Sequence, residues 1–195
     1  RYCPFVARAS CVCSCGRPAA VATLDAVAAR IDDWPLAGCA WKTVAAWMEE
    51  AYRRGRHTFA AADDDPTVER LHDWRKRVKD IWYHQRLTCP AWPEVIGAQS
   101  EEAHRLSEIL GDDHDLAVLA ELLGADVGSR PTVPIDPEPL LGLIAERRAE
   151  LVAGARHLGT LIYAERGTAF GQRVRRYLEH ARARCEAEAA DGVRV

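Results

Sequence analysis

Four side chains that donate hydrogen bonds recur at three- and four-residue steps within residues 71–87. They are His72, Arg75, Lys76 and Lys79. On a helix of 3.6 residues per turn they share a sector of about 100°, beside an apolar stripe. That stripe consists of Leu71, Trp74, Val78, Ile81 and Trp82. The acids Asp73 and Asp80 fall outside the basic sector, so the sequence predicts that nothing on this helix neutralises the four side chains.

Like charges at this spacing repel one another by a few tenths of a kcal/mol per pair. The repulsion is relieved by acids on another helix, by solvent around an exposed cationic face, or by an external anion. A ladder of donors without acceptors suits a chain of phosphate oxygens. The pattern therefore favours a binding site for a polyanion.

Two further features bear on such a site. Arg148 falls within the apolar stripe of a later helix, where a charge needs a partner, so we expect it to pair with an acid or to reach the anion. Residues 112–115 read Asp-Asp-His-Asp. Because successive helical residues cannot all face one ion, we interpret Asp112 or Asp115 as a partner of the basic helix, with a metal site as the alternative.

The elements that position these residues are all predicted to be helical. Apolar residues recur at helical spacing over six segments, with no convincing strand. The segments are 19–31, 40–62, 66–87, 100–123, 136–164 and 168–189. We expect caps at Asp65 or Thr67, at Ser100 and at Asp136. The fold class is therefore all-α, a bundle of five to six amphipathic helices over 21–190, with an irregular arm over 1–20 and a loop over 124–139.

Composition narrows the function further. The 195 residues carry a formal net charge of −3, which excludes coating of polyanions by bulk charge and requires a local patch. No apolar run reaches the roughly 18 residues of a membrane-spanning helix. Seven cysteines, four of them within the first fifteen residues, do not form an even disulfide framework. We therefore expect reduced thiols and a cytoplasmic protein.

At this point the sequence resembles the CHAD family, the conserved-histidine α-helical domain. The resemblance rests on residues 72–83, HDWRKRVKDIWY, and on residues 110–119, LGDDHDLAVL, about thirty positions later. Residues 52–56, YRRGR, resemble the family's basic helix end, and residues 161–165, LIYAE, continue the likeness. The resemblance extends roughly over 24–183.

The resemblance implies binding of inorganic polyphosphate, with no catalysis, cofactor or metal, and an association with polyphosphate granules. The fold that the resemblance implies consists of two pseudo-symmetric helical bundles that enclose a basic groove. Carried over to this chain, the lining residues are His72, Arg75, Lys76 and Lys79, followed by Arg53 and Arg56.

The chain departs from the family in size, since no second helix with a histidine and basic residues precedes residue 72. The sequence therefore resembles only the family's C-terminal half, its second bundle. Half of the phosphate-lining wall would be absent, so we expect weak binding or a homodimer that rebuilds the groove.

Two alternatives remain open at this stage. The dipeptides His72-Asp73 and His114-Asp115 are typical of HD-type metal-dependent phosphohydrolases, which need further ligands that converge on the metal. A degenerate helical bundle without a ligand is the other alternative. Weak non-specific nucleic-acid binding by the same basic patch is a further expectation.

Overall fold

The computed structural model describes residues 16–30, 41–124 and 136–192. The chain divides into two compact units, Arg1–Cys39 and Ala40–Val195. In the first unit, α1 (Gly16–Ala29) is a single helix whose larger apolar side chains, such as Leu24, are exposed. The second unit holds the remaining elements. They are α2 (Trp41–Asp64), α3 (Val68–Thr88), the short 3-10 helix η1 (Cys89–Ala91), α4 (Pro93–Gly124), α5 (Glu138–Ile162) and α6 (Gly167–Gly192).

The predicted all-α fold class is confirmed, because every regular element in the described ranges is a helix. The first of them, α1, begins at Gly16, inside the segment predicted as an irregular arm, and the units divide after Cys39. The N-terminal cysteine cluster and most of the predicted 124–139 loop lie outside the described residues. None of the described helices is both long and apolar enough to cross a membrane.

Local sequence explains where the helices start. The Thr67 side chain caps α3 by accepting a hydrogen bond from the Arg70 amide at 3.3 Å, as predicted. Asp136, two residues before the start of α5, likewise accepts a hydrogen bond from the Glu138 amide at 3.1 Å.

The predicted cap at Ser100 is wrong. Ser100 is buried inside α4, which begins seven residues earlier at Pro93. Proline is tolerated in the first turn of a helix because its missing N–H has no partner there. Pro93 therefore starts this helix, although in sequence it looks like a stop signal.

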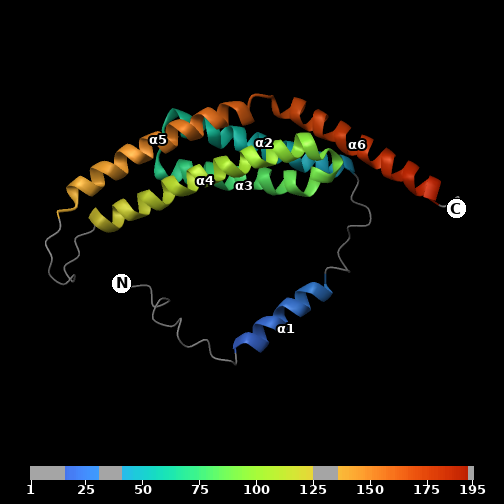
Figure 1. The fold of residues 1–195 in the computed structure, drawn as a ribbon, viewed down its shortest axis with the longest axis horizontal. Coiled ribbons are helices and arrows are strands. Elements are labelled where there is room, and N and C mark those ends of the chain that lie inside the picture. The colour runs from blue at the N-terminus through green and yellow to red at the C-terminus, as the bar shows by residue number, and fades with distance from the viewer. Residues whose placement is uncertain (1–15, 31–40, 125–135, 193–195) are drawn as a thin grey trace. The chain divides into compact units, whose positions relative to one another are not determined.

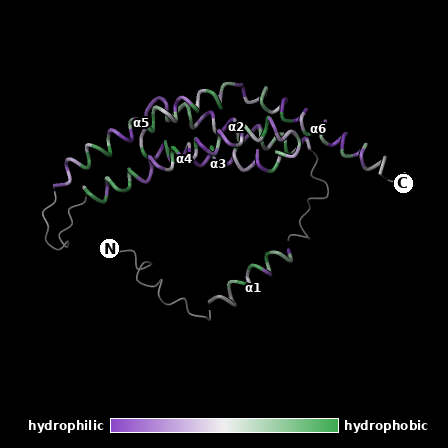
Figure 2. Tube along the Cα trace, in the orientation of Figure 1, coloured by the Kyte–Doolittle hydropathy of each residue, from purple (hydrophilic) through white to green (hydrophobic). Residues whose placement is uncertain are grey.

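The five long helices of the second unit pack as neighbours around one core. As Figure 1 shows, α4 lies along α3 and α5, and α2 packs against both α3 and α6. Hydrophobic and hydrophilic residues alternate along these helices in Figure 2, as expected of amphipathic elements. The predicted apolar stripe of α3 is confirmed, since Leu71, Trp74, Val78 and Ile81 are all buried.

An aromatic cluster joins α2 to the connection between α5 and α6. The ring of Tyr52 stacks on Phe170 with the ring centroids 4.1 Å apart. Its hydroxyl donates to the Ile162 carbonyl at 2.9 Å, so a buried polar group is satisfied where α5 ends. Phe59 packs against both Trp74 and Tyr163. These contacts hold α2 and α3 against the segment where α5 ends and α6 begins.

The tryptophans of the second unit differ in their burial. Trp74 is fully buried, and Trp92 meets Tyr177 edge-on where η1 approaches α6. However, Trp41 and Trp47 are exposed on the first turns of α2.

Close packing around Gly159 gives a stability prediction. A methyl group added there would lie 2.7 Å from ring carbons of Phe59 and Trp74, whereas one added at Gly154 on the same helix meets nothing within 4 Å. We expect Gly159→Ala to lower the free energy of unfolding by about 1–3 kcal/mol through overpacking. Gly154→Ala is the matched control and should raise it by up to about 1 kcal/mol through helix propensity. Urea denaturation measures both, and equal effects of the two substitutions would contradict the packing described here.

Candidate anion-binding surface

The surface of interest lies along the contact between α3 and α4, which run antiparallel. The rings of His72 and His114 stack with centroids 4.7 Å apart, and those of Trp82 and His104 stack at 4.1 Å. Between these two ring pairs, the Arg75 Nε atom donates to the Ser107 carbonyl at 3.3 Å. The contact thus aligns predicted residues of α3 with a row of residues on α4. We call His72, Arg75, Lys76 and Lys79 the basic surface.

Gly111 makes room for Arg75 within this contact. A Cβ atom at position 111 would lie 3.2 Å from both the Nε and Nη2 atoms of Arg75. The guanidinium therefore lies directly against the α4 backbone and is half-buried. Packing and the hydrogen bond to Ser107 fix its position, and no acid in the described ranges forms an ion pair with it.

The two lysines of the basic surface differ in their partners. Lys76 forms an ion pair with Asp73 at 2.7 Å, so the prediction that nothing on this helix neutralises the basic residues is wrong. Side chains three residues apart on a helix are neighbours, and the long Lys76 side chain reaches the carboxylate. Both groups are exposed, so the pair contributes little stability. Lys79 forms no ion pair within the described residues and lies 6.0 Å from the centroid of the Tyr83 ring.

Arg53 lies apart from the basic surface. With Arg54 it binds Glu50, and these two hydrogen-bonded guanidinium groups lower the pKa of the Glu50 carboxyl. It lines a hollow between α2 and α3 with Arg54, His57 and Arg77. On α3, Arg77 faces away from Arg75, about 160° round the helix, because the two are two residues apart. The structure therefore does not bring Arg53 to the other predicted residues.

Arg56 is exposed on α2 and forms no ion pair within 41–124 and 136–192. No contact joins it to the basic surface in those ranges.

Arg148 is engaged by an acid, one of the two outcomes that its sequence position allowed. Its Nε and Nη2 atoms donate to the two carboxylate oxygens of Asp113 at 2.9 and 3.3 Å. Asp113 is 1% exposed, so this bidentate pair ties α5 to α4 inside the bundle. The acid that forms a pair is thus Asp113; Asp112 and Asp115 are exposed and have no ion pair among the described residues, which corrects their expected role.

His72 has an environment that disfavours its charged form. Burial, followed by the charges of Lys76, His114 and Arg75, lowers the pKa of His72 below its reference value of 6.5. The Nδ1 atoms of both His72 and His114 are buried and have no hydrogen-bond partner within the described residues. An anion that approached this histidine pair would offset the neighbouring positive charges and favour protonation.

The sequence contains a signal for the α3–α4 contact that periodicity alone does not use. His72 and Trp82 are ten residues apart on α3, and His104 and His114 are ten residues apart on α4. Because the helices run antiparallel, His72 meets His114 and Trp82 meets His104. Arg86 adds a cation 5.4 Å from the centroid of the Trp82 ring. Reading each helix separately therefore missed His104 and the stacking role of His114.

The described residues do not gather a metal site. No group of three or more His, Cys, Asp or Glu side chains in these ranges could hold a metal ion. His72 and His114 meet each other, but Asp73 turns to Lys76. The described residues therefore do not supply the converging metal ligands that an HD-type phosphohydrolase needs.

The buried ion pair gives the second prediction. Removing Arg148 by Arg148→Ala leaves the Asp113 carboxylate buried without a partner, and we expect the free energy of unfolding to fall by about 3 kcal/mol. The control is Arg147→Ala, which breaks an exposed pair with Glu150 and should cost less than about 1 kcal/mol. Urea denaturation of the two variants would show similar losses if the pair did not stabilise the bundle.

Comparison with known proteins assigns the family. No curated protein and no solved structure matches the chain. The family model of the CHAD domain matches residues 16–124, more than half of the chain and in its N-terminal part. The match includes α1 through α4, and with them every residue of the basic surface. It corrects the extent of the resemblance, which the sequence placed over 24–183 and confined to the C-terminal half of the family. The chain belongs to the CHAD domain family.

Proposed function

We propose that this protein binds inorganic polyphosphate through the basic surface of α3, as a binding module without catalytic activity. The observation that carries the proposal is the alignment of His72, Arg75 and Lys79 along the α3–α4 contact. In this alignment Arg75 is held by backbone contacts and Lys79 has no acidic partner in the described part of the chain. Membership of the CHAD family supports the same ligand.

The physical basis is electrostatic. Phosphate oxygens accept charge-assisted hydrogen bonds from guanidinium and ammonium groups. Binding of a polyanion releases its condensed counterions, so the affinity falls as salt rises, by analogy with nucleic acids. Lys76 joins the site when phosphate competes with Asp73, because an exposed pair holds it only weakly.

The remaining candidates have different roles in this proposal. Arg148 is assigned to the bundle interior, because both oxygens of Asp113 already hold its guanidinium. Arg56 is an additional cation available on α2, and Arg53 belongs to the separate hollow with Arg77. The primary ligand set is therefore His72, Arg75, Lys76 and Lys79.

The first test of the proposal removes charge from the basic surface. We expect Arg75→Gln/Lys79→Gln to weaken polyphosphate binding at least tenfold and to reduce the slope of log affinity against log salt by about two, one for each lost phosphate contact. Isothermal titration calorimetry at two or more salt concentrations measures both quantities. The stoichiometry also reports whether two chains share one polyphosphate.

The matched control is Arg175→Gln/Arg182→Gln. It removes two positive charges from exposed pairs on α6 and should leave the affinity nearly unchanged. Equal losses in both double variants would indicate an effect of net charge and not a site. A folded parent protein that does not bind would favour the degenerate bundle, and equal binding of single-stranded DNA would favour a non-specific anion patch.

The second test uses the pH dependence set by His72. Burial and the positive charges beside it lower the pKa of the free His72, and a bound polyanion should raise that pKa, so binding takes up a proton. The affinity should therefore increase as the pH falls from the bound-state pKa to the lower free-state pKa. Calorimetry in buffers of different ionisation enthalpy measures the uptake, which His72→Gln should reduce. An unchanged proton uptake in His72→Gln would assign the effect to another group.

A further inference from the structure

An exposed aromatic ring lies at one end of the basic surface. Tyr83 follows Lys79 by four residues on α3, which is one helical turn or a rise of about 6 Å. It is seven residues from Lys76 and eleven from His72, close to whole numbers of turns, so it shares their side of the helix. The residue is 47% exposed, so a ligand on the basic surface can reach it.

The ring of Tyr83 has one covered face and one that a planar ligand can use. Trp82 stacks on it with the ring centroids 4.7 Å apart, and Trp82 itself stacks on His104 of α4. No other ring among the described residues stacks on Tyr83. The Lys79 ammonium group lies 6.0 Å from the ring centroid and has no acidic partner in the described ranges. It can therefore turn to a phosphate while an aromatic ligand covers the ring.

Cations lie on both sides of Tyr83 along the helix, but in unequal number. On one side the basic surface extends from Lys79 to His72, a rise of about 10 Å. On the other side Arg86 is exposed, 5.4 Å from the centroid of the Trp82 ring, and forms no ion pair in the described part of the chain. Sites for single-stranded nucleic acid place several rings along a charged groove. One exposed ring beside a row of donors instead matches one base that carries several phosphates.

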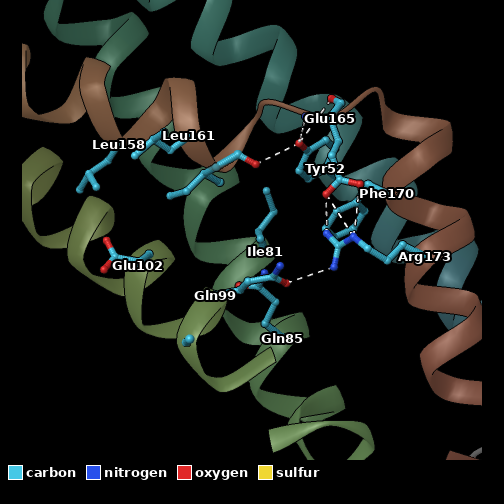
Figure 3. A pocket seen from close by; sticks show the side chains of 12 residues that line it. Tyr52, Ile81, Gln85, Gln99, Glu102, Leu158, Leu161, Glu165, Phe170 and Arg173 are labelled. Carbon is cyan, nitrogen blue, oxygen red and sulfur yellow. Dashed lines mark hydrogen bonds and ion pairs between the residues drawn. The ribbon is translucent and has the colours of Figure 1, made fainter. Parts of the chain in front are cut away.

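The pocket drawn in Figure 3 does not offer the same combination. Arg173, which lines it, is engaged by the Glu165 carboxylate at 2.6 Å. The rings of Tyr52 and Phe170 in its lining are buried and stack on each other with centroids 4.1 Å apart. An aromatic phosphate ligand would therefore find neither an exposed ring nor an unpaired arginine in that pocket.

We propose that the basic surface and Tyr83 together bind a nucleoside polyphosphate, a single nucleoside with three or more phosphates. The base stacks on the Tyr83 face opposite Trp82, and the phosphates extend from Lys79 towards His72. Every base has an aromatic face, so stacking adds affinity without selecting one base strictly. This inference rests on the proposed function, because the phosphates use the same basic surface.

The experiment titrates tripolyphosphate, UTP and ATP into the full chain by calorimetry, with EDTA present so that metal ions do not change the charge of the probes. Tripolyphosphate carries at least as much negative charge as ATP, so electrostatics alone cannot favour ATP. We expect ATP to bind at least about fivefold more tightly than tripolyphosphate, the gain typical of one stacked base. UTP should lie between them because its smaller ring stacks over less area.

Three variants locate the stacking. Tyr83→Leu should lower the affinity for ATP to that for tripolyphosphate and leave the affinity for tripolyphosphate unchanged. Tyr83→Phe keeps the ring and should keep the preference for ATP. The matched control, Trp47→Leu, removes a 56% exposed ring from α2, away from the basic surface, and should also keep the preference.

The outcomes separate this inference from the proposed function. Equal affinities for ATP and tripolyphosphate, or equal effects of Tyr83→Leu and Trp47→Leu, would overturn the stacking and leave polyphosphate binding intact. A deoxyadenosine pentamer, whose four phosphates match the charge of ATP, would identify a single strand as the ligand if it bound more tightly than ATP, and this too would overturn the inference. If none of these probes binds, the inference fails, and a titration with long-chain polyphosphate shows whether the proposed function fails with it.

Discussion

The antiparallel contact between α3 and α4 determines where the chemistry of this protein is located. Two stacked ring pairs, His72 with His114 and Trp82 with His104, fix the register of the two helices. Between them Gly111 lets the Arg75 guanidinium approach the α4 backbone. A slide of one helical turn would separate both ring pairs and move Arg75 away from the glycine. The placement of the basic surface therefore depends on this register as much as on the presence of basic residues.

Local pairing then decides which of the many cations remain available to an anion. Several arginines are engaged by acids three or four residues away on the same helix, as Arg53 is by Glu50 and Arg175 by Glu179. Arg148 is held more firmly, because its carboxylate partner is buried. Lys79 is different: no acid pairs with it in the described ranges, and an aromatic ring lies beside it. In a chain of negative net charge, such local imbalance is what creates a site for a polyanion.

Helical periodicity predicted much of this structure but not its pairings. The apolar stripe of α3 and the caps at Thr67 and Asp136 follow from local rules and are confirmed. The start of α4 at Pro93 was missed because proline both ends and begins helices. The acid that pairs with Arg148 was not identified because Asp113 lies on another helix, 35 positions away in the sequence. A single helical wheel also placed Asp73 away from Lys76, although a flexible side chain spans that angle.

The faces of α3 have different surroundings because they pack against different helices, chiefly α2 and α4. The face of α3 that carries Arg75 and Lys79 offers donors along α4, whereas Ile81 and Gln85 line a pocket that residues of α5 and α6 also line. Arg173 also lines this pocket, and there the Glu165 carboxylate pairs with its guanidinium at 2.6 Å. Charges separated by more than about 8–10 Å through solvent are largely screened at physiological salt. A cation that keeps its acidic partner, as Arg173 does, therefore adds little to the field that an anion would meet at the basic surface.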